Sequence, residues 1–184
     1  SVDSPFDYDE VMKVFAHELK AHEKVEKVVE LLADDEQTLI LFKSEYAMQQ
    51  FKAQIPTEWQ DGIAFEGERE LSSIVRDFQQ KRVQVLCSYN LWEGLDIPQD
   101  ALTRVIIHDL PFPPKDPLFD ARRQHAVDSF KEVDLPCMLL RLRQGAGRHI
   151  RTSADSGTVH LLLADDEQQM KKEIEGVFPV KITF

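Results

Sequence analysis

Cysteine is scarce in this sequence, and long hydrophobic runs are missing. The 184 residues contain two cysteines, Cys87 and Cys137, too few for a disulfide framework or a four-thiolate metal site. We therefore expect both to be buried apolar residues, and we expect no metal site. No apolar segment approaches the roughly 20 residues that cross a bilayer, and residues 1–8 are acidic, unlike a signal peptide. These absences predict a cytoplasmic protein without membrane contact.

A phosphate-binding loop is also missing, because no G-x-x-x-x-G-K-[ST] motif occurs. Residues 160–168, HLLLADDEQ, imitate the strand and acidic end of a nucleotide-hydrolysing site. Without the loop, we interpret these acids as the opening of a helix, whose N-terminus favours negative charge. Bases are outnumbered as well, 22 against 33 acids, for a net charge of -11. This balance argues against a dedicated nucleic-acid-binding module, so such contact must be local or shared with another domain.

The sequence does contain a regular alternation of strand and helix patterns, over a length that suits one domain. Thr38 to Phe42 is a continuous apolar run, typical of a strand buried in a parallel sheet. Residues 11–15 fit either a short strand or the first turn of a helix. The other expected strands are 62–65, 83–87, 104–110, 158–164 and 180–184, and the expected helices are 22–32, 46–55, 71–80, 118–130, 139–151 and 167–176. This order predicts an α/β fold with a mainly parallel sheet between helices.

The most distinctive stretch is 139–151, LLRLRQGAGRHIR. Read as a helix, it places four polar residues on one face: Arg141, Gln144, Arg148 and Arg151. Three arginines without an acid suit an anion, because guanidinium groups match phosphate oxygens two at a time. Gly145 and Gly147 each cost a helix interior about 1 kcal/mol relative to alanine, which indicates close approach of a backbone or ligand. A plain solvated face is the alternative, and the pattern favours an anion site.

Ligands of such sheets bind beyond the carboxyl ends of the strands. This rule selects Lys43 with Ser44, the loop 88–98, and Asp109. The loop is unusual because it holds acids at a strand end where packing alone would not require them. Within it, we interpret Trp92 as a packing anchor, because lone aromatic residues usually lie inside. His108, in an apolar strand, is interpreted as a hydrogen-bonded core residue.

Three blocks in this order carry a family resemblance: LWEGLDIP (91–98), IIHDLPFPPKDPLFDAR (106–122) and QGAGRHIR (144–151). They resemble the second motor lobe of the DinG/XPD-type DNA helicases of superfamily 2, whose motif V reads F-W-E-G-V-D-I-P and whose motif VI reads Q-x-x-G-R-x-x-R. SPFDY (4–8) and ILFKS (40–44) resemble the entry to this lobe and motif IV. The resemblance implies that 1–184 is one three-layer RecA-like domain, a fragment of a larger protein from which the first motor lobe is absent.

By this resemblance, Arg148 and Arg151 would be arginine fingers for the γ-phosphate of ATP held by the other lobe. Gln144 would help to order that interface. Phosphoryl transfer needs positioned positive charge where oxygens gain negative charge, so the chemistry agrees with the motif.

The resemblance also assigns roles to the strand-end loops. Asp96 would face the nucleotide ribose or link the site to motif VI, while Glu93 and Gly94 shape the loop. Ser44 and Ser88 would contact phosphates of single-stranded DNA.

The implied cofactors are ATP and Mg²⁺, bound mainly by the first lobe of the same polypeptide. An iron–sulfur cluster, common in relatives, would lie outside this chain. The implied activity is that of an ATP-dependent DNA helicase in DNA repair or replication, with the isolated fragment inactive. A non-catalytic nucleic-acid-binding or scaffold domain with a RecA-like fold is the main alternative. A phosphoacceptor or flavodoxin-like domain fits less well, because Asp34, Asp35 and Glu36 precede their strand instead of following it.

Overall fold

The computed structural model describes residues 12–93, 104–146 and 157–184. These residues form one seven-stranded sheet in the order β3-β4-β2-β5-β6-β1-β7, and every neighbouring pair is parallel. The strands are β1 (Met12–Glu18), β2 (Thr38–Leu41), β3 (Ile63–Phe65), β4 (Val85–Ser88), β5 (Arg104–Ile107), β6 (Gly157–Leu163) and β7 (Ile182–Thr183).

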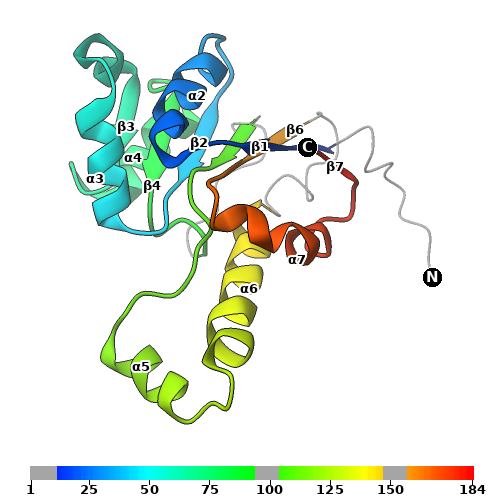
Figure 1. Ribbon diagram of the computed structural model, residues 1–184. Coiled ribbons are helices and arrows are strands. Elements are labelled where there is room, and N and C mark those ends of the chain that lie inside the picture. The colour runs from blue at the N-terminus through cyan, green and yellow to red at the C-terminus, as the bar shows by residue number, and fades with distance from the viewer. Residues whose placement is uncertain (1–11, 94–103, 147–156) are drawn as a thin grey trace, which may run out of the picture.

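Helices cover both faces of this sheet (Figure 1). One face packs against α2 (Lys24–Leu31) and α3 (Glu45–Gln54), through a core that includes Val28, Met48 and Phe51. The other face packs against α4 (Leu71–Gln79), α6 (Leu135–Ala146) and α7 (Lys171–Glu175). Short 3-10 turns precede or link these helices: η1 (Ala21–Glu23), η2 (Thr57–Gly62) and η6 (Glu167–Met170). The predicted three-layer α/β fold is confirmed.

Of the segment that could not be assigned from sequence, 11–15, the described residues 12–15 belong to a strand. In β1, residues Met12 to Glu18 pair with β6, whose residues follow more than 140 positions later, and with β7 on the other side. The predicted strand 104–110 is shorter than expected, since β5 ends at Ile107. There the chain leaves the ladder at His108 and Asp109, which enter a polar cluster described below.

The predicted helix 118–130 is wrong in its second half. A helix does begin where Asp116 caps Phe119, but α5 (Pro117–Gln124) buries no residue and stops at Gln124. Asp128 then starts a new segment: its side chain accepts from Lys131 N, and its own N–H donates to Glu132. This reciprocal cap opens the π-helix η4 (Phe130–Asp134), which continues into α6.

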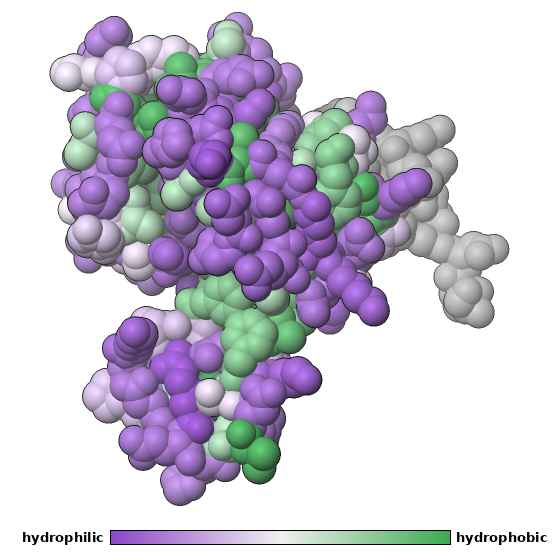
Figure 2. Space-filling model, viewed as in Figure 1, coloured by the Kyte–Doolittle hydropathy of each residue, from purple (hydrophilic) through white to green (hydrophobic). Residues whose placement is uncertain are grey.

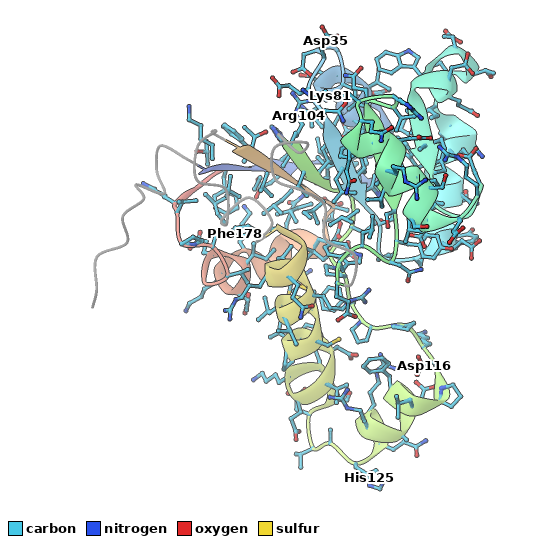
Figure 3. The ribbon with its side chains drawn as sticks, turned by 180° about the vertical axis from the view of Figure 1, so that it is seen from behind. Asp35, Lys81, Arg104, Asp116, His125 and Phe178 are labelled. Atoms are coloured by element: carbon cyan, nitrogen blue, oxygen red, sulfur yellow. The ribbon has the colours of Figure 1, made fainter. Side chains whose placement is uncertain are left out.

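Together α5, η4 and the first half of α6 form an arm that projects from the sheet (Figure 1), and Figure 3 places Asp116 and His125 on it, far from the strands. Arg123 holds the arm together by donating to Asp120 and Asp134, at 2.9 Å, and to two proline carbonyls. Apolar side chains remain exposed here, including Leu118 and Val127, and Figure 2 shows green surface on the arm among mainly purple surroundings.

The two cysteines, which we expected to be buried, differ in their exposure. Cys87 is fully buried in β4 as expected, whereas Cys137 is only half-buried, because it lies on the partly solvated face of α6. Within the described ranges, no helix is both long and apolar enough to cross a bilayer.

Candidate nucleotide and nucleic-acid interface

The carboxyl end of β2 leads directly into α3, and Ser44 marks the junction. The Ser44 hydroxyl accepts a hydrogen bond from Ala47 N at 3.1 Å, so Ser44 is the N-cap of α3. Lys43 beside it is exposed, and Ser44 itself is half-buried. A cation and a helix N-terminus therefore lie together at the carboxyl ends of the strands. Arg104, labelled in Figure 3, lies at the opposite side of the sheet, at the amino end of β5.

The carboxyl end of β4 is held by a buried carboxylate. Ser88 is fully buried, and its hydroxyl donates to Glu66 Oε1 at 2.5 Å. The same carboxylate accepts from Tyr89 N and Asn90 N through Oε1 and from the Asn90 amide through Oε2, at 2.6 to 3.2 Å. The Ser88 hydroxyl also accepts from Leu91 N at 3.0 Å. A phosphate would reach Ser88 only if this network opened, so a DNA contact through Ser88 stays a prediction.

Glu66 was missed by sequence reasoning. It is buried to 6% exposure directly after β3, and it organises the backbone of the loop that follows the neighbouring strand. An acid immediately after a short apolar strand was the available signal, but its partners lie 22 to 24 residues away. No local pattern identifies them.

Trp92 joins three parts of the candidate site. Its indole N–H donates to Phe42 O at 2.8 Å, at the exit of β2, and the ring is fully buried. On the other side, a Cβ built on Gly145 of α6 would lie 2.7 Å from Trp92 Cε3 and 2.9 Å from Leu41 Cδ1. The interpretation of Trp92 as a packing anchor is confirmed. Gly145 lacks a side chain, which allows the Trp92 ring to lie against the backbone of α6, and this explains a glycine inside a helix.

This contact predicts that Gly145→Ala is destabilising. The Trp92 ring and Leu41 are both fully buried, so the added methyl group would overpack the core at a cost of about 1 to 3 kcal/mol. That cost exceeds the helix-propensity gain of up to about 1 kcal/mol. The measurement is the free energy of unfolding in urea. Gly176→Ala is the matched control, because its Cβ would meet only Glu173 O at 3.5 Å. Equal stability of the two variants would contradict the close packing of α6 on Trp92.

The polar face of α6 divides into two kinds of residue. Gln144 is exposed, and its role at the site stays a prediction. Arg141 instead lies over Trp92, with its guanidinium carbon 6.0 Å from the ring centroid, and reaches Pro111 O at 3.5 Å. Glu93 is exposed. Glu93 and Gln144 are the chain neighbours of Trp92 and Gly145, which contact each other. The remaining predicted site residues lie outside the described residues: Arg148, Arg151, Asp96 and Gly94.

A buried ionic cluster ties the carboxyl ends of β5 and β6 to the start of α2. Lys24 Nζ lies 2.6 Å from Glu167 Oε1, 3.5 Å from Asp109 Oδ1, and donates to His108 O at 2.6 Å. Burial alone would raise the pKa of Asp109, but the His108 ring, Lys24 and Lys43 lower it to about 2. His108 is hydrogen-bonded to Asp109 at 2.9 Å, which confirms the structural interpretation of this histidine.

The acids of the 160–168 segment therefore have two different roles. Asp166 caps η6 by accepting from Glu167 N, as expected for a helix start. Glu167 is instead buried, accepting from Leu110 N and Ala164 N in addition to Lys24. Helix capping explains Asp166 but not Glu167, because Glu167 balances the charge of Lys24, whose burial could not be inferred from the sequence.

Comparison with known proteins identifies the family of this domain. Residues 26–182 match the helicase C-terminal domain family. The chain is 45% identical to the probable ATP-dependent helicase YpvA of Bacillus subtilis over 98% of its own length, and 30% identical to the 3'-5' exonuclease DinG of the same organism over 88%. It spans 29% and 20% of these two relatives, respectively.

Solved structures support the fold. An XPD helicase structure matches with a TM-score of 0.69 at 15% identity, over 91% of this chain and 34% of that one. The C-terminal domain of the DEAD-box protein Dbp5 matches with a TM-score of 0.68 at 18% identity, over 96% and 91%. With the family match over most of its length, the chain belongs to the helicase C-terminal domain family, and its homologues are ATP-dependent helicases of the DinG and YpvA type.

Proposed function

We propose that this chain is the C-terminal motor lobe of an ATP-dependent DNA helicase that acts in DNA repair or replication in the cytoplasm. The family match and the helicase names of the relatives support this proposal. In it, the first RecA-like lobe of the same polypeptide holds most of the ATP and Mg²⁺, and any iron–sulfur cluster also lies outside this chain.

On the nucleotide side, Arg148 and Arg151 would place positive charge beside the γ-phosphate, where oxygens gain charge as the terminal phosphoryl group leaves. ATP supplies the free energy of the cycle when it is bound. Gln144 would order the contact between lobes, and its exposure at the last described turn of α6 suits that role.

The loop after β4 would serve the nucleotide from the opposite side, with Asp96 at the ribose and Glu93 and Gly94 shaping the turn. The described part of this loop is firmly held, by Glu66 at its start and by Trp92 at its centre. A preorganised loop suits a catalytic contact, because orientation is established before the reaction begins.

On the nucleic-acid side, Ser44 would bind a phosphate of single-stranded DNA together with exposed Lys43 and the N-terminus of α3. Helix N-termini bind phosphate through free backbone N–H groups and the helix dipole. The net charge of the chain is negative, so binding of a nucleic-acid phosphate depends on local positive charge, which Lys43 would supply here.

One observation carries the proposal: Trp92 contacts both the exit of β2 and the helix α6. The proposed DNA contact at Ser44 and the proposed ATP contacts beyond Gln144 are thereby attached to one rigid side chain. A chain of packed side chains of this kind is one route by which two ligand sites can be coupled.

The test is ATP hydrolysis by the full-length polypeptide and by this chain alone. We expect turnover by the full-length protein that rises when single-stranded DNA is added, and no turnover by the isolated chain above a mock preparation. Nucleic-acid binding by the full-length protein without hydrolysis would favour the scaffold alternative and contradict the motor proposal.

A further inference from the structure

A cavity of about 410 Å³ opens at the carboxyl edge of the sheet, beside Lys43. It lies between the start of α2, the helix α3 and the segment that follows β5. Its volume is at the lower end of the range for ligand pockets, and it suits a group of about nucleoside size. None of the roles argued above uses this space.

The cavity wall is apolar on two sides and polar at a few points. Val25 and Ala47 contribute aliphatic surface, and Phe51 and Phe112 contribute aromatic surface. At the mouth, Tyr46 in the first turn of α3 is 74% exposed, unusual for a large aromatic side chain. Apolar and aromatic side chains in the wall, with an aromatic ring at the entrance, suit a planar heterocycle.

Polar groups in the wall offer hydrogen bonds to the edge of such a ring. Gln50 carries an amide that both donates and accepts, whereas the Gln54 amide nitrogen already donates to Gln50 O at 3.1 Å and offers its remaining donor and its oxygen. His108 also lines the cavity, and its Nδ1 is bound to Asp109 at 2.9 Å. The other ring nitrogen, Nε2, donates or accepts a hydrogen bond according to the tautomer, so it suits a polar group at the edge of a base.

The charges in the wall disfavour an anion inside the cavity. Asp109, Asp166 and Glu167 line it, and Lys24 is already paired with two carboxylates. Lys43 also lines the cavity, but its side chain is exposed, and it lies beside the N-terminus of α3, so positive potential is concentrated at this part of the rim. This arrangement suits a group that is neutral at its inner end and carries its phosphate at the mouth.

We propose that the cavity receives one nucleobase of the single-stranded nucleic acid, with its phosphate at Lys43 and Ser44 and its ring against Tyr46. This inference rests on the proposed function and adds a base-binding site to it. The site would hold the strand in register relative to α3, and stacking would make it tolerant of base identity.

The test uses the full-length polypeptide and short DNA oligonucleotides, each with one abasic position, moved along the strand. Binding is measured by fluorescence anisotropy for the wild type, Tyr46→Ala, Tyr46→Phe and the cavity-filling Ala47→Leu. Gln49→Ala is the matched control, because Gln49 is exposed on α3 but does not line the cavity. Urea unfolding of each variant confirms that it is folded.

We expect Tyr46→Ala to weaken binding roughly 5- to 100-fold, the range for loss of one stacked base. Tyr46→Phe should stay within about twofold of the wild type because it keeps the ring that stacks on the base. Gln49→Ala should do the same because Gln49 lies outside the cavity. One abasic position should weaken wild-type binding by a similar factor and have no further effect in Tyr46→Ala or Ala47→Leu.

Two results would overturn the site while leaving the proposed function intact: tight DNA binding that no abasic position and no Tyr46 variant affects, or saturable, Tyr46-dependent binding of free adenosine monophosphate without an abasic effect. The second result would assign the cavity to a free nucleotide. If the wild type binds no oligonucleotide, the proposed function fails together with the site.

Discussion

Replacing Arg148 by alanine in the full-length polypeptide is expected to slow ATP hydrolysis by about 10³- to 10⁵-fold, the range for loss of an arginine finger. This corresponds to roughly 4 to 7 kcal/mol of activation free energy. The fold and DNA affinity should change little, because the side chain is proposed to act only on the charge of the departing phosphoryl group. Steady-state hydrolysis and oligonucleotide binding, measured on the same preparation, check both parts.

Arg143→Ala is the matched control for this prediction. Arg143 is an exposed arginine on α6, and in the helix predicted from the sequence over 139–151 it falls off the face that would carry Gln144 and Arg148. We expect its hydrolysis rate to remain close to that of the wild type. Wild-type turnover in Arg148→Ala, or an equal loss in both variants, would refute the finger assignment.

Replacing Lys24 by methionine is expected to destabilise the domain by about 3 to 5 kcal/mol, because it leaves buried carboxylates without their cation. Glu167 and Asp109 both contact Lys24, and all three side chains are nearly inaccessible to water. Urea unfolding measures the loss. Lys27→Met is the control, since its partner Glu30 is largely exposed and such a pair contributes only about 0 to 1 kcal/mol.

The stability of the same variant should depend less on pH than that of the wild type in the range between the folded and the free pKa of Asp109. The pKa of Asp109 is about 2 in the folded protein and 3.8 as a free side chain, so its charge stabilises the fold above the higher value. This contribution is lost as the pH falls toward 2. Without Lys24 the folded pKa moves back toward the free value, so less stability should be lost as the pH falls through this range. Adding Glu167→Gln to Lys24→Met should recover part of the stability, whereas a double variant less stable than Lys24→Met would contradict the charge argument.

Strand positions could be predicted wherever the sequence carries an uninterrupted apolar run. Thr38 to Phe42 is such a run, and β2 lies between β4 and β5 with all its side chains buried. The first strand could not be assigned in this way, because its pattern alternates and its stability comes from pairing with distant β6 and β7. The prediction of one helix over 118–130 was too long for a local reason, because Asp128 caps a separate helical segment that begins after it.

By itself, the sequence determined the family, the α/β alternation and the residues with phosphate chemistry, because motifs and apolar periodicity are properties of neighbouring positions. Only the tertiary structure showed that Glu66 holds the loop after β4, that Gly145 admits Trp92, and that Lys24 is buried between two acids. The physical reason is that these interactions join segments 22 to 143 residues apart. Burial makes such contacts strong, and burial is decided by the packing of the whole chain.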